Sequence, residues 1–504
     1  MNLVQNYTEY IRQSQLENLK LTQSLDKNTD ALKQIFKDDN TFIVRDIILD
    51  SKEKQRCRLF FVDGMVNTEI INRDVVNPLL VSFEKSKKNH TIDFIKTQVL
   101  HANDVKQSED ITFIVDSILY GDTVLLTDDE STCLVINTKG WKSRSISEPD
   151  EEKILSGPRE GFTEAILSNT TLIRRKVKNN DLKFKFSSIG KRSNTKICIC
   201  FIESLADKKL VEQLEQRLNK IDIDAILDAN YLTELIKDNP YSLFDTIGST
   251  EKPDIVAGRL LEGRIALLVD GSPVVLTLPY LFVENFQSDD DYYQNFYFSS
   301  IGRILRIISF IFTIFTPALY IGIMAFGGRF LPHTLAISIS RAREGVPLPV
   351  FAECIIMLFV FEILREAGVR MSNSMGHALS VVGGLVIGQS AVEAKLISAP
   401  TVIIIAFAGI TGLMLPRLKS SVVILRLVFA FCTSLLGFFG AILCGVWLLL
   451  HLAYLNSFGI SYTAYMLNYK RLSPLKDTYV RAPWWKMKTR PTVFTKNGVR
   501  LSSF

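Results

Sequence analysis

The chain changes character near residue 303. From there to residue 457 it holds several long apolar segments, and the first, residues 304–326, carries one charged side chain, Arg306. About 20 predominantly apolar residues match the hydrocarbon thickness of a bilayer. Residues 1–302 instead mix charged and apolar positions as aqueous domains do. The pattern therefore predicts an aqueous N-terminal region joined to a membrane-embedded helical region.

The aqueous region contains one pattern of strands and helices twice. Each copy is expected to have a strand, a helix, a second helix that ends at a glycine, and two further strands: 57–62, 68–82, Gly121, 122–126 and 132–135 in the first copy, and 196–202, 208–218, Gly263, 264–268 and 273–276 in the second. Glycine there supplies the left-handed residue that ends a helix, and Asp270-Gly271 is typical of a hairpin. Coincidental similarity between two ordinary α/β units is the alternative.

These patterns predict a fold of mixed α+β and α-helical membrane class. We expect a cytosolic N-terminal region of two related small α/β subdomains, then a transmembrane domain of about four spans with interfacial or re-entrant helices. The expected segments are a polar stretch at 1–30, subdomains at 31–148 and 149–300, transmembrane helices at 301–460 and a basic tail at 461–504.

Composition excludes little beyond this. The net charge is only +5, and acids and bases are mixed in the aqueous region, so nothing favours a nucleic-acid partner. Cys198 and Cys200 would share one strand face, but no histidine or second cysteine pair lies near them to complete a zinc site. Asp222 and Asp224 are best explained as solvated surface carboxylates. No dinucleotide, phosphate-loop or zinc-protease motif is present, so we expect reduced structural thiols, no metal, no cofactor and no enzymatic activity.

Charged residues gather at the end of the helix expected from residue 350. Glu362 and Arg365 stand three apart, and Glu366 and Arg370 stand four apart, spacings at which opposite charges meet on a helix. Charges facing lipid are costly, so these side chains should face protein or water. Two interpretations stay open: an interfacial amphipathic helix with surface ion pairs, and the charged vestibule of a conduit.

Small residues form a stripe in the next helical segment. The stripe has one small residue every fourth position, with two polar residues at its end: Gly376, Ser380, Gly384 and Gly388, then Gln389 and Glu393. In membranes such a stripe lets helices approach closely. It can also line a pore that small side chains keep open, and in an oligomer both interpretations can hold.

The remaining apolar runs are less regular. Residues 400–416 form a short run bounded by prolines. Residues 422–455 are long enough for a surface helix followed by one full span, a division that Arg426 favours.

Charge placement predicts the topology. The N-terminus has no basic-then-apolar signal peptide, and Arg303 and Arg306 precede the first span, so the aqueous region should be cytosolic. Basic residues around Trp484-Trp485 place the tail there as well. With both ends on one side the number of spans must be even, and we expect four. Arg417 and Lys419 would then lie outside, against the charge rule.

Several segments together resemble one known family. They are, in order, 157–162 (GPREGF), 169–175 (NTTLIRR), 221–224 (IDID), 261–264 (LEGR), 343–347 (REGVP), 361–368 (FEILREAG), 387–394 (IGQSAVEA) and 483–487 (PWWKM). Spread in this order over residues 28–490, they resemble the A subunits of the GerA family of spore germination receptors. Leu348 and Lys395 depart from the family pattern, and Lys395 would change the charge near one mouth of a channel.

The resemblance implies a function and partners. It implies a receptor in the inner membrane of the spore that triggers germination when nutrients appear, in which this chain works with a transporter-like B subunit and a lipoprotein C subunit. It also implies a homo-oligomer that forms a nutrient-gated cation channel. The alternative is a non-conducting membrane scaffold that assembles the receptor complex.

Overall fold

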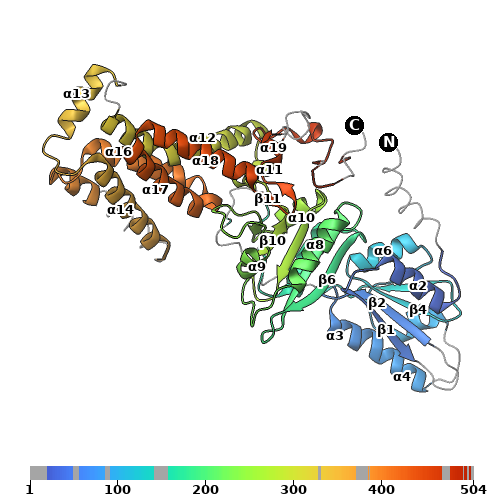
Figure 1. Cartoon of the computed structure of the whole chain (residues 1–504). Helices are drawn as coiled ribbons and strands as arrows, with labels where there is room; N and C mark the ends of the chain where they lie inside the picture. The colour runs from blue at the N-terminus through green and yellow to red at the C-terminus, as the bar shows by residue number, and fades with distance from the viewer. Residues whose placement is uncertain are drawn as a thin grey trace.

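A computed structural model describes residues 20–48, 56–85, 91–140, 152, 157–326, 331–370, 384, 386–467, 477–491, 493–495 and 499–500. Two five-stranded sheets with their helices form the N-terminal part, and long helices form the C-terminal part, which extends to the upper left in Figure 1.

The first α/β unit is built on an antiparallel sheet of order β1-β2-β4-β5-β3. Its elements are α2 (Leu25–Ile35), β1 (Phe42–Ile48), β2 (Arg56–Val62), α3 (Thr68–Ile70), the π-helix η1 (Ile71–Val76), α4 (Asn77–Lys85), α5 (Ile92–Phe94), the π-helix η2 (Ile95–Val99), β3 (Val105–Ser108), α6 (Ile111–Leu119), β4 (Thr123–Thr127) and β5 (Cys133–Ile136). Leu25 is fully buried in its core. The unit thus begins earlier than the predicted boundary at residue 31.

The second α/β unit has the same sheet order, β6-β7-β9-β10-β8. Its elements are α7 (Ile166–Lys176), β6 (Leu182–Ile189), β7 (Thr195–Ile202), α8 (Lys208–Asn219), α9 (Ala229–Ile236), β8 (Gly248–Thr250), α10 (Pro253–Leu261), β9 (Ile265–Val269), β10 (Val275–Leu278), the 3-10 helix η3 (Phe282–Phe286) and α11 (Asp290–Tyr293). Cys198 and Cys200 both point into the same buried cluster from β7. Asp222 and Asp224 make exposed ion pairs with Lys191 and Arg192.

The two units share local contacts as well as strand order. Asn28 at the start of α2 bonds the backbone N–H and the carbonyl of Thr22, and Asn169 in α7 does the same with Thr163. Gly121 and Gly263 both have positive φ, at 95° and 92°, as expected of residues that end helices. The sequence analysis did not predict the four edge strands β1, β3, β6 and β8. An edge strand pairs with a neighbour on one side only, and its apolar and polar residues alternate less clearly along the chain.

One buried ion pair joins the units. Arg174 of α7 lies 2.6 Å from Asp39, and both side chains are almost fully buried. Arg174 also donates to the Thr41 hydroxyl at 3.0 Å, and the backbone of Asn40 bonds Phe184 of β6. Because each charge is costly to bury alone, this pair favours one arrangement of the units.

The helical part contains one long helix and several shorter ones. They are α12 (Phe296–Phe326), α13 (His333–Ala342), α14 (Val350–Arg370), α16 (Ala399–Leu413), the 3-10 helix η5 (Pro416–Leu418), α17 (Lys419–Leu436) and α18 (Phe438–Tyr454), followed by the short elements β11 (Asn456–Ser457), β12 (Ile460–Ser461), α19 (Ala464–Leu467) and the 3-10 helix η7 (Trp484–Lys486). By length and composition, two segments of the described chain can cross a bilayer, Phe296–Phe326 and Pro416–Leu436. The predicted count of four spans stays a prediction.

The expected surface helix after residue 422 is wrong. Arg426 lies in α17, which packs against α12, and only 2% of its surface is exposed. Its guanidinium is paired with Glu362 of α14. A charge that seemed to mark a solvated helix is therefore an internal one, held by a partner 64 residues away along the chain.

Replacing Asp39 by Ala tests the tie between the units. The change leaves Arg174 buried without its carboxylate, which should destabilise the fold by about 3–5 kcal/mol and lower the midpoint of thermal unfolding of the purified full-length chain. Asp46→Ala is the matched control, because Asp46 pairs with Arg58 at an exposed position and should cost at most about 1 kcal/mol. Equal midpoints for the two variants would contradict this assignment.

Candidate functional site

Buried charges gather where the second α/β unit, α12 and the C-terminal segment meet. Arg303 of α12 is fully buried and donates to Asp291 at 2.8 Å and to the Asp477 carboxylate and carbonyl, each at 2.8 Å. Arg306, one turn further, pairs with the same Asp291. The sequence indicated these arginines as an entry signal at the membrane surface, whereas the structure shows that they tie three segments together.

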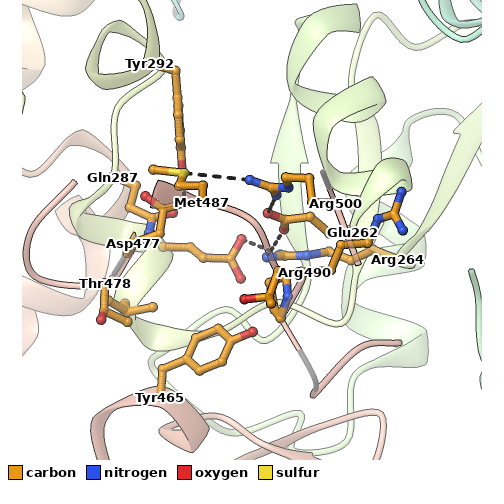
Figure 2. A pocket seen from close by; sticks show the side chains of 14 residues that line it. Glu262, Arg264, Gln287, Tyr292, Tyr465, Asp477, Thr478, Met487, Arg490 and Arg500 are labelled. Carbon is orange, nitrogen blue, oxygen red and sulfur yellow. Dashed lines mark hydrogen bonds and ion pairs between the residues drawn. The ribbon is translucent and has the colours of Figure 1, made fainter. Parts of the chain in front are cut away.

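A second group of charges lies beside the first. Arg264 at the start of β9 pairs with Glu284 at 2.5 Å and with Glu262 at 3.1 Å. Arg500 near the C-terminus also reaches Glu262, at 2.9 Å. Figure 2 shows Arg264 and Arg500 converging on Glu262 while Asp477 and Tyr292 enter the same pocket from the other side. The C-terminal segment, which here means the described residues between 477 and 500, therefore forms one wall of this pocket.

Arg417 connects the helical part to the second α/β unit and to the segment between the two units. It sits in η5, between α16 and α17, and pairs with Glu152 at 3.1 Å and with Asp289 at 3.6 Å. Glu152, from the segment between the two units, also accepts hydrogen bonds from Thr250 and from the backbone of Glu251. Burial raises the pKa of Asp289 to about 6, against the opposing effect of Arg417.

These contacts correct the predicted position of the α16–α17 connection. Arg417 and Lys419 were expected to lie on the side opposite the aqueous region. Because Arg417 touches Glu152 and Asp289, this connection lies beside the second α/β unit, contrary to that expectation.

Two cavities flank Arg417 and Asp289. One, of about 380 Å³, lies between α10, α11 and the C-terminal segment, and Arg259, Tyr293 and Trp484 contribute to its lining. The other, of about 570 Å³, opens between β8, α12 and η5. Since both cavities share Asp289 and Arg417, a rearrangement of this pair would change both. Within the described residues, no group of His, Cys, Asp and Glu side chains is placed to hold a metal ion.

The predicted charged helix is α14. Glu362 and Arg365 form an ion pair one turn apart, and Glu362 also pairs with the buried Arg426. Glu366 is exposed on the same helix, and Arg370 ends it, with a side chain outside the described part of the structure. The role of these four residues in a conduit stays a prediction.

The small-residue stripe is described only in part. Gly376 and Ser380 lie outside the described residues. A Cβ placed on Gly384 would meet nothing within 4 Å, whereas one on Gly388 would lie 3.7 Å from Val402 of α16. Gln389 donates to Glu393 at 2.7 Å on an exposed face. The stripe thus has one position against a neighbouring helix and one in open space.

Sequence reasoning missed a polar cluster inside the helical part. Glu353 in the first turn of α14 is fully buried and pairs with Arg343 at 3.0 Å. It also accepts hydrogen bonds from the hydroxyl and backbone N–H of Ser398 and from the hydroxyl of Thr401. Arg343 stands in the REGVP segment, but nothing in the one-dimensional pattern links it to residues 398–401.

Comparison with known proteins identifies the chain. The family model of the Bacillus/Clostridium GerA spore germination protein matches residues 30–493, which is most of the sequence. The chain belongs to the GerA family of spore germination proteins. The family resemblance carried by its motifs is thereby confirmed.

Individual GerA-family members match along most of their length. Spore germination protein KA of Bacillus subtilis is 36% identical over 94% of this chain and 88% of its own. The uncharacterized membrane protein YfkQ of Bacillus subtilis is 38% identical, covering 87% and 86%. The N-terminal domain of the A subunit of the Bacillus megaterium germinant receptor GerK3 aligns with 52% of this chain and 98% of its own, with 27% identity and a TM-score of 0.42.

Replacing Glu362 by Ala tests the charged helix of this GerA-family chain. Arg426 would remain buried with no carboxylate opposite it, at a cost of several kcal/mol, so the yield of folded chain purified in detergent should fall sharply. Glu393→Ala removes an exposed carboxylate that accepts a hydrogen bond from Gln389, and this control should leave the yield unchanged. If both variants purify like the parent, the Glu362–Arg426 pair does not hold α14 against α17.

Proposed function

We propose that this chain is the A subunit of a nutrient receptor in the inner membrane of the spore, and that it triggers germination as an oligomeric, nutrient-gated cation channel. Membership of the GerA family supports the germination role. The observation that supports gating is the junction at Arg417, where one side chain joins the segment between the α/β units to the connection of two apolar helices.

The junction suits transmission of a signal. A change in the relative position of the two units moves Glu152, which is bonded to Arg417. Arg417 lies in the short connection between the end of α16 at Leu413 and the start of α17 at Lys419, so a shift there alters the packing of both helices. Arg303 meanwhile keeps α12 attached to the second unit, so the movement is confined to the α16–α17 pair.

We propose a topology in which α12, α16, α17 and α18 are the four spans. The Arg417 contacts and the insertion of Phe458 into the core of the second unit support a topology with the α16–α17 connection and the end of α18 on the side of the aqueous units. With 15 residues, α16 is only about 22 Å long at about 1.5 Å per residue. That length falls short of a hydrocarbon core of about 30 Å, so the bilayer is expected to thin around it.

Polar groups inside the helical part supply a path for ions. Glu353 and Glu362 are carboxylates held among apolar helices by arginines and hydroxyls. Ionisable residues at membrane depth mark ion pathways in many proteins. An oligomer that places α14 near its axis would present this helix to permeating cations.

Partners follow from the same proposal. A transporter-like B subunit and a lipoprotein C subunit would complete the receptor, and the lipid bilayer would surround the helical part. The second candidate function is a non-conducting scaffold that assembles the complex, favoured by the packing of Gly388 against Val402, which is what a sealed helix interface requires.

The Arg417–Glu152 pair provides a test of gating. Spores carrying Arg417→Ala or Glu152→Ala should accumulate the receptor normally, because Arg303 still attaches α12, but should release potassium more slowly after nutrient addition. The double variant should be no slower than either single variant, since the two residues act as a unit. Lys191→Ala with Asp222→Ala, an exposed pair of the second α/β unit, is the matched control. Purely additive effects on the release rate would contradict coupling through this pair.

Substitutions in the small-residue stripe distinguish the channel function from the scaffold function. Gly384→Leu adds a side chain where the structure leaves open space, so the complex should assemble with its normal number of protomers while potassium release falls if this face lines the conduit. A Cβ at Gly388 already reaches contact distance of Val402, 3.7 Å, so the larger side chain of Gly388→Leu should disturb this helix contact and decrease assembly. Normal assembly and normal release in the Gly384→Leu variant would exclude a conduit-lining position for this face.

A further inference from the structure

Exposed aromatic rings surround the aqueous ends of the long helices. Tyr297 and Phe298 in the first turn of α12 are 68% and 65% exposed, and Tyr454 at the end of α18 is 75% exposed. In the C-terminal segment, Trp484 and Trp485 are 50% and 61% exposed. Tyrosine and tryptophan rings gather at the level of lipid headgroups in membrane proteins. These side chains therefore mark the level at which the helical part leaves the bilayer.

A loop of the second α/β unit is attached at the same level. The hydroxyl of Ser242 lies 3.3 Å from the Nε2 atom of His451 in the last turn of α18. The carbonyl of Leu243 accepts a hydrogen bond from Ser421 in the first turn of α17, and Phe244 is buried among residues of α12, α17 and α18. The loop is therefore held against the ends of two apolar helices. Tyr241, directly before these contacts, is fully exposed.

The helix that leads into this loop has an exposed apolar face. Tyr231 and Leu235 stand four residues apart in α9 and are 44% and 48% exposed, and Leu227, directly before the N-cap residue Asp228, is 67% exposed. On the opposite face, Leu232 and Ile236 are buried in the core of the second unit. In Figure 1, α9 lies on the left flank of this unit, the side from which the helical part extends.

We infer that the face formed by Leu227, Tyr231, Leu235 and Tyr241 contacts the phospholipid headgroup layer of the bilayer that the chain's own helices cross. The inference rests on the proposed membrane placement of the helical part. It adds that the second α/β unit lies on the membrane surface instead of standing free above it.

Three observations favour lipid as the occupant. Five residues separate Ile236 from Ser242, so the attached loop keeps α9 close to the helix ends. The face combines leucine with tyrosine, a composition suited to a layer that is apolar on one side and wet on the other. Asp238, the acidic residue that follows α9, is paired with Arg217 and bonds the backbone of Phe458. Its charge is therefore directed into the protein and not toward the anionic headgroups.

The position of the face has a mechanical consequence. The second unit is then held to the membrane at three places: at Arg303 of α12, at Phe458 after α18, and at the α9 face. A body held at three points is less able to tilt. Movement of the first unit relative to the second would consequently act on Glu152 and Arg417 instead of rocking the whole aqueous region.

Site-directed fluorescence quenching tests the inference on the full-length chain in phospholipid nanodiscs. Tyr241→Cys and Leu235→Cys, each labelled with a small fluorophore, should lose fluorescence when the lipids carry a headgroup nitroxide and should be partly shielded from iodide. Leu80→Cys is the matched control for Leu235→Cys, because Leu80 on α4 of the first unit is 43% exposed and Leu235 is 48% exposed. The unsubstituted chain, whose seven cysteines are buried or half-buried, gives the background.

The outcomes distinguish failure of this inference from failure of the proposed membrane placement of the helical part. Ile311→Cys on α12, which is 49% exposed, should be quenched by nitroxides on the acyl chains. If it is not, the membrane placement fails and the inference falls with it. If Ile311→Cys is quenched while Tyr241→Cys and Leu235→Cys respond like Leu80→Cys, the inference alone is overturned. Disulfide cross-linking between two copies through Cys at position 241 would also overturn it, since a second copy would then cover this face.

Discussion

The guanidinium of Arg303 and the two aspartates around it hold this molecule together. A charge with no exposed surface is strongly unfavourable unless it is paired and hydrogen-bonded. Asp291 comes from the second α/β unit and Asp477 from the C-terminal segment, while Arg303 itself begins the first long apolar helix. Tyr292 adds its ring, 5.4 Å from the guanidinium. Loss of either aspartate would leave the buried guanidinium of Arg303 with fewer partners.

Because α12 is held firmly by Arg303, the contacts of Arg417 are the place where the aqueous and helical parts can shift relative to each other. The pairing of Arg417 with Glu152 and Asp289 is less enclosed, since the Arg417 side chain is 23% exposed and cavities lie on both sides of it. An interaction of this kind can rearrange at lower cost than the one at Arg303. The architecture therefore joins the aqueous and helical parts through one firm contact and one adaptable contact.

The interior of the helical part is more polar than a bundle built only for packing. Glu353, Glu362 and Arg426 are buried or half-buried among apolar helices, each with a charged partner. Such pairs seldom add stability over well-packed hydrophobic side chains, so their presence favours a role in specifying the arrangement of α14. That role needs α14 to remain next to α16 and α17, and these helices contact each other in the fold.

The sequence alone determined the division into an aqueous and an apolar half, the doubled α/β pattern, the helix-ending glycines and the family. Each of these rests on local spacing, which the chain carries whatever its tertiary contacts. It misplaced Arg417 and Arg426, because a lone arginine in an apolar run has the same pattern whether it faces water or a buried carboxylate. Only the tertiary structure decided that Glu152 would pair with Arg417 and Asp477 with Arg303. It likewise decided that Glu353 would accept a hydrogen bond from Ser398. These partners lie tens to hundreds of residues apart, and ion pairs over such separations depend on how the chain folds back, for which one-dimensional periodicity has no signal.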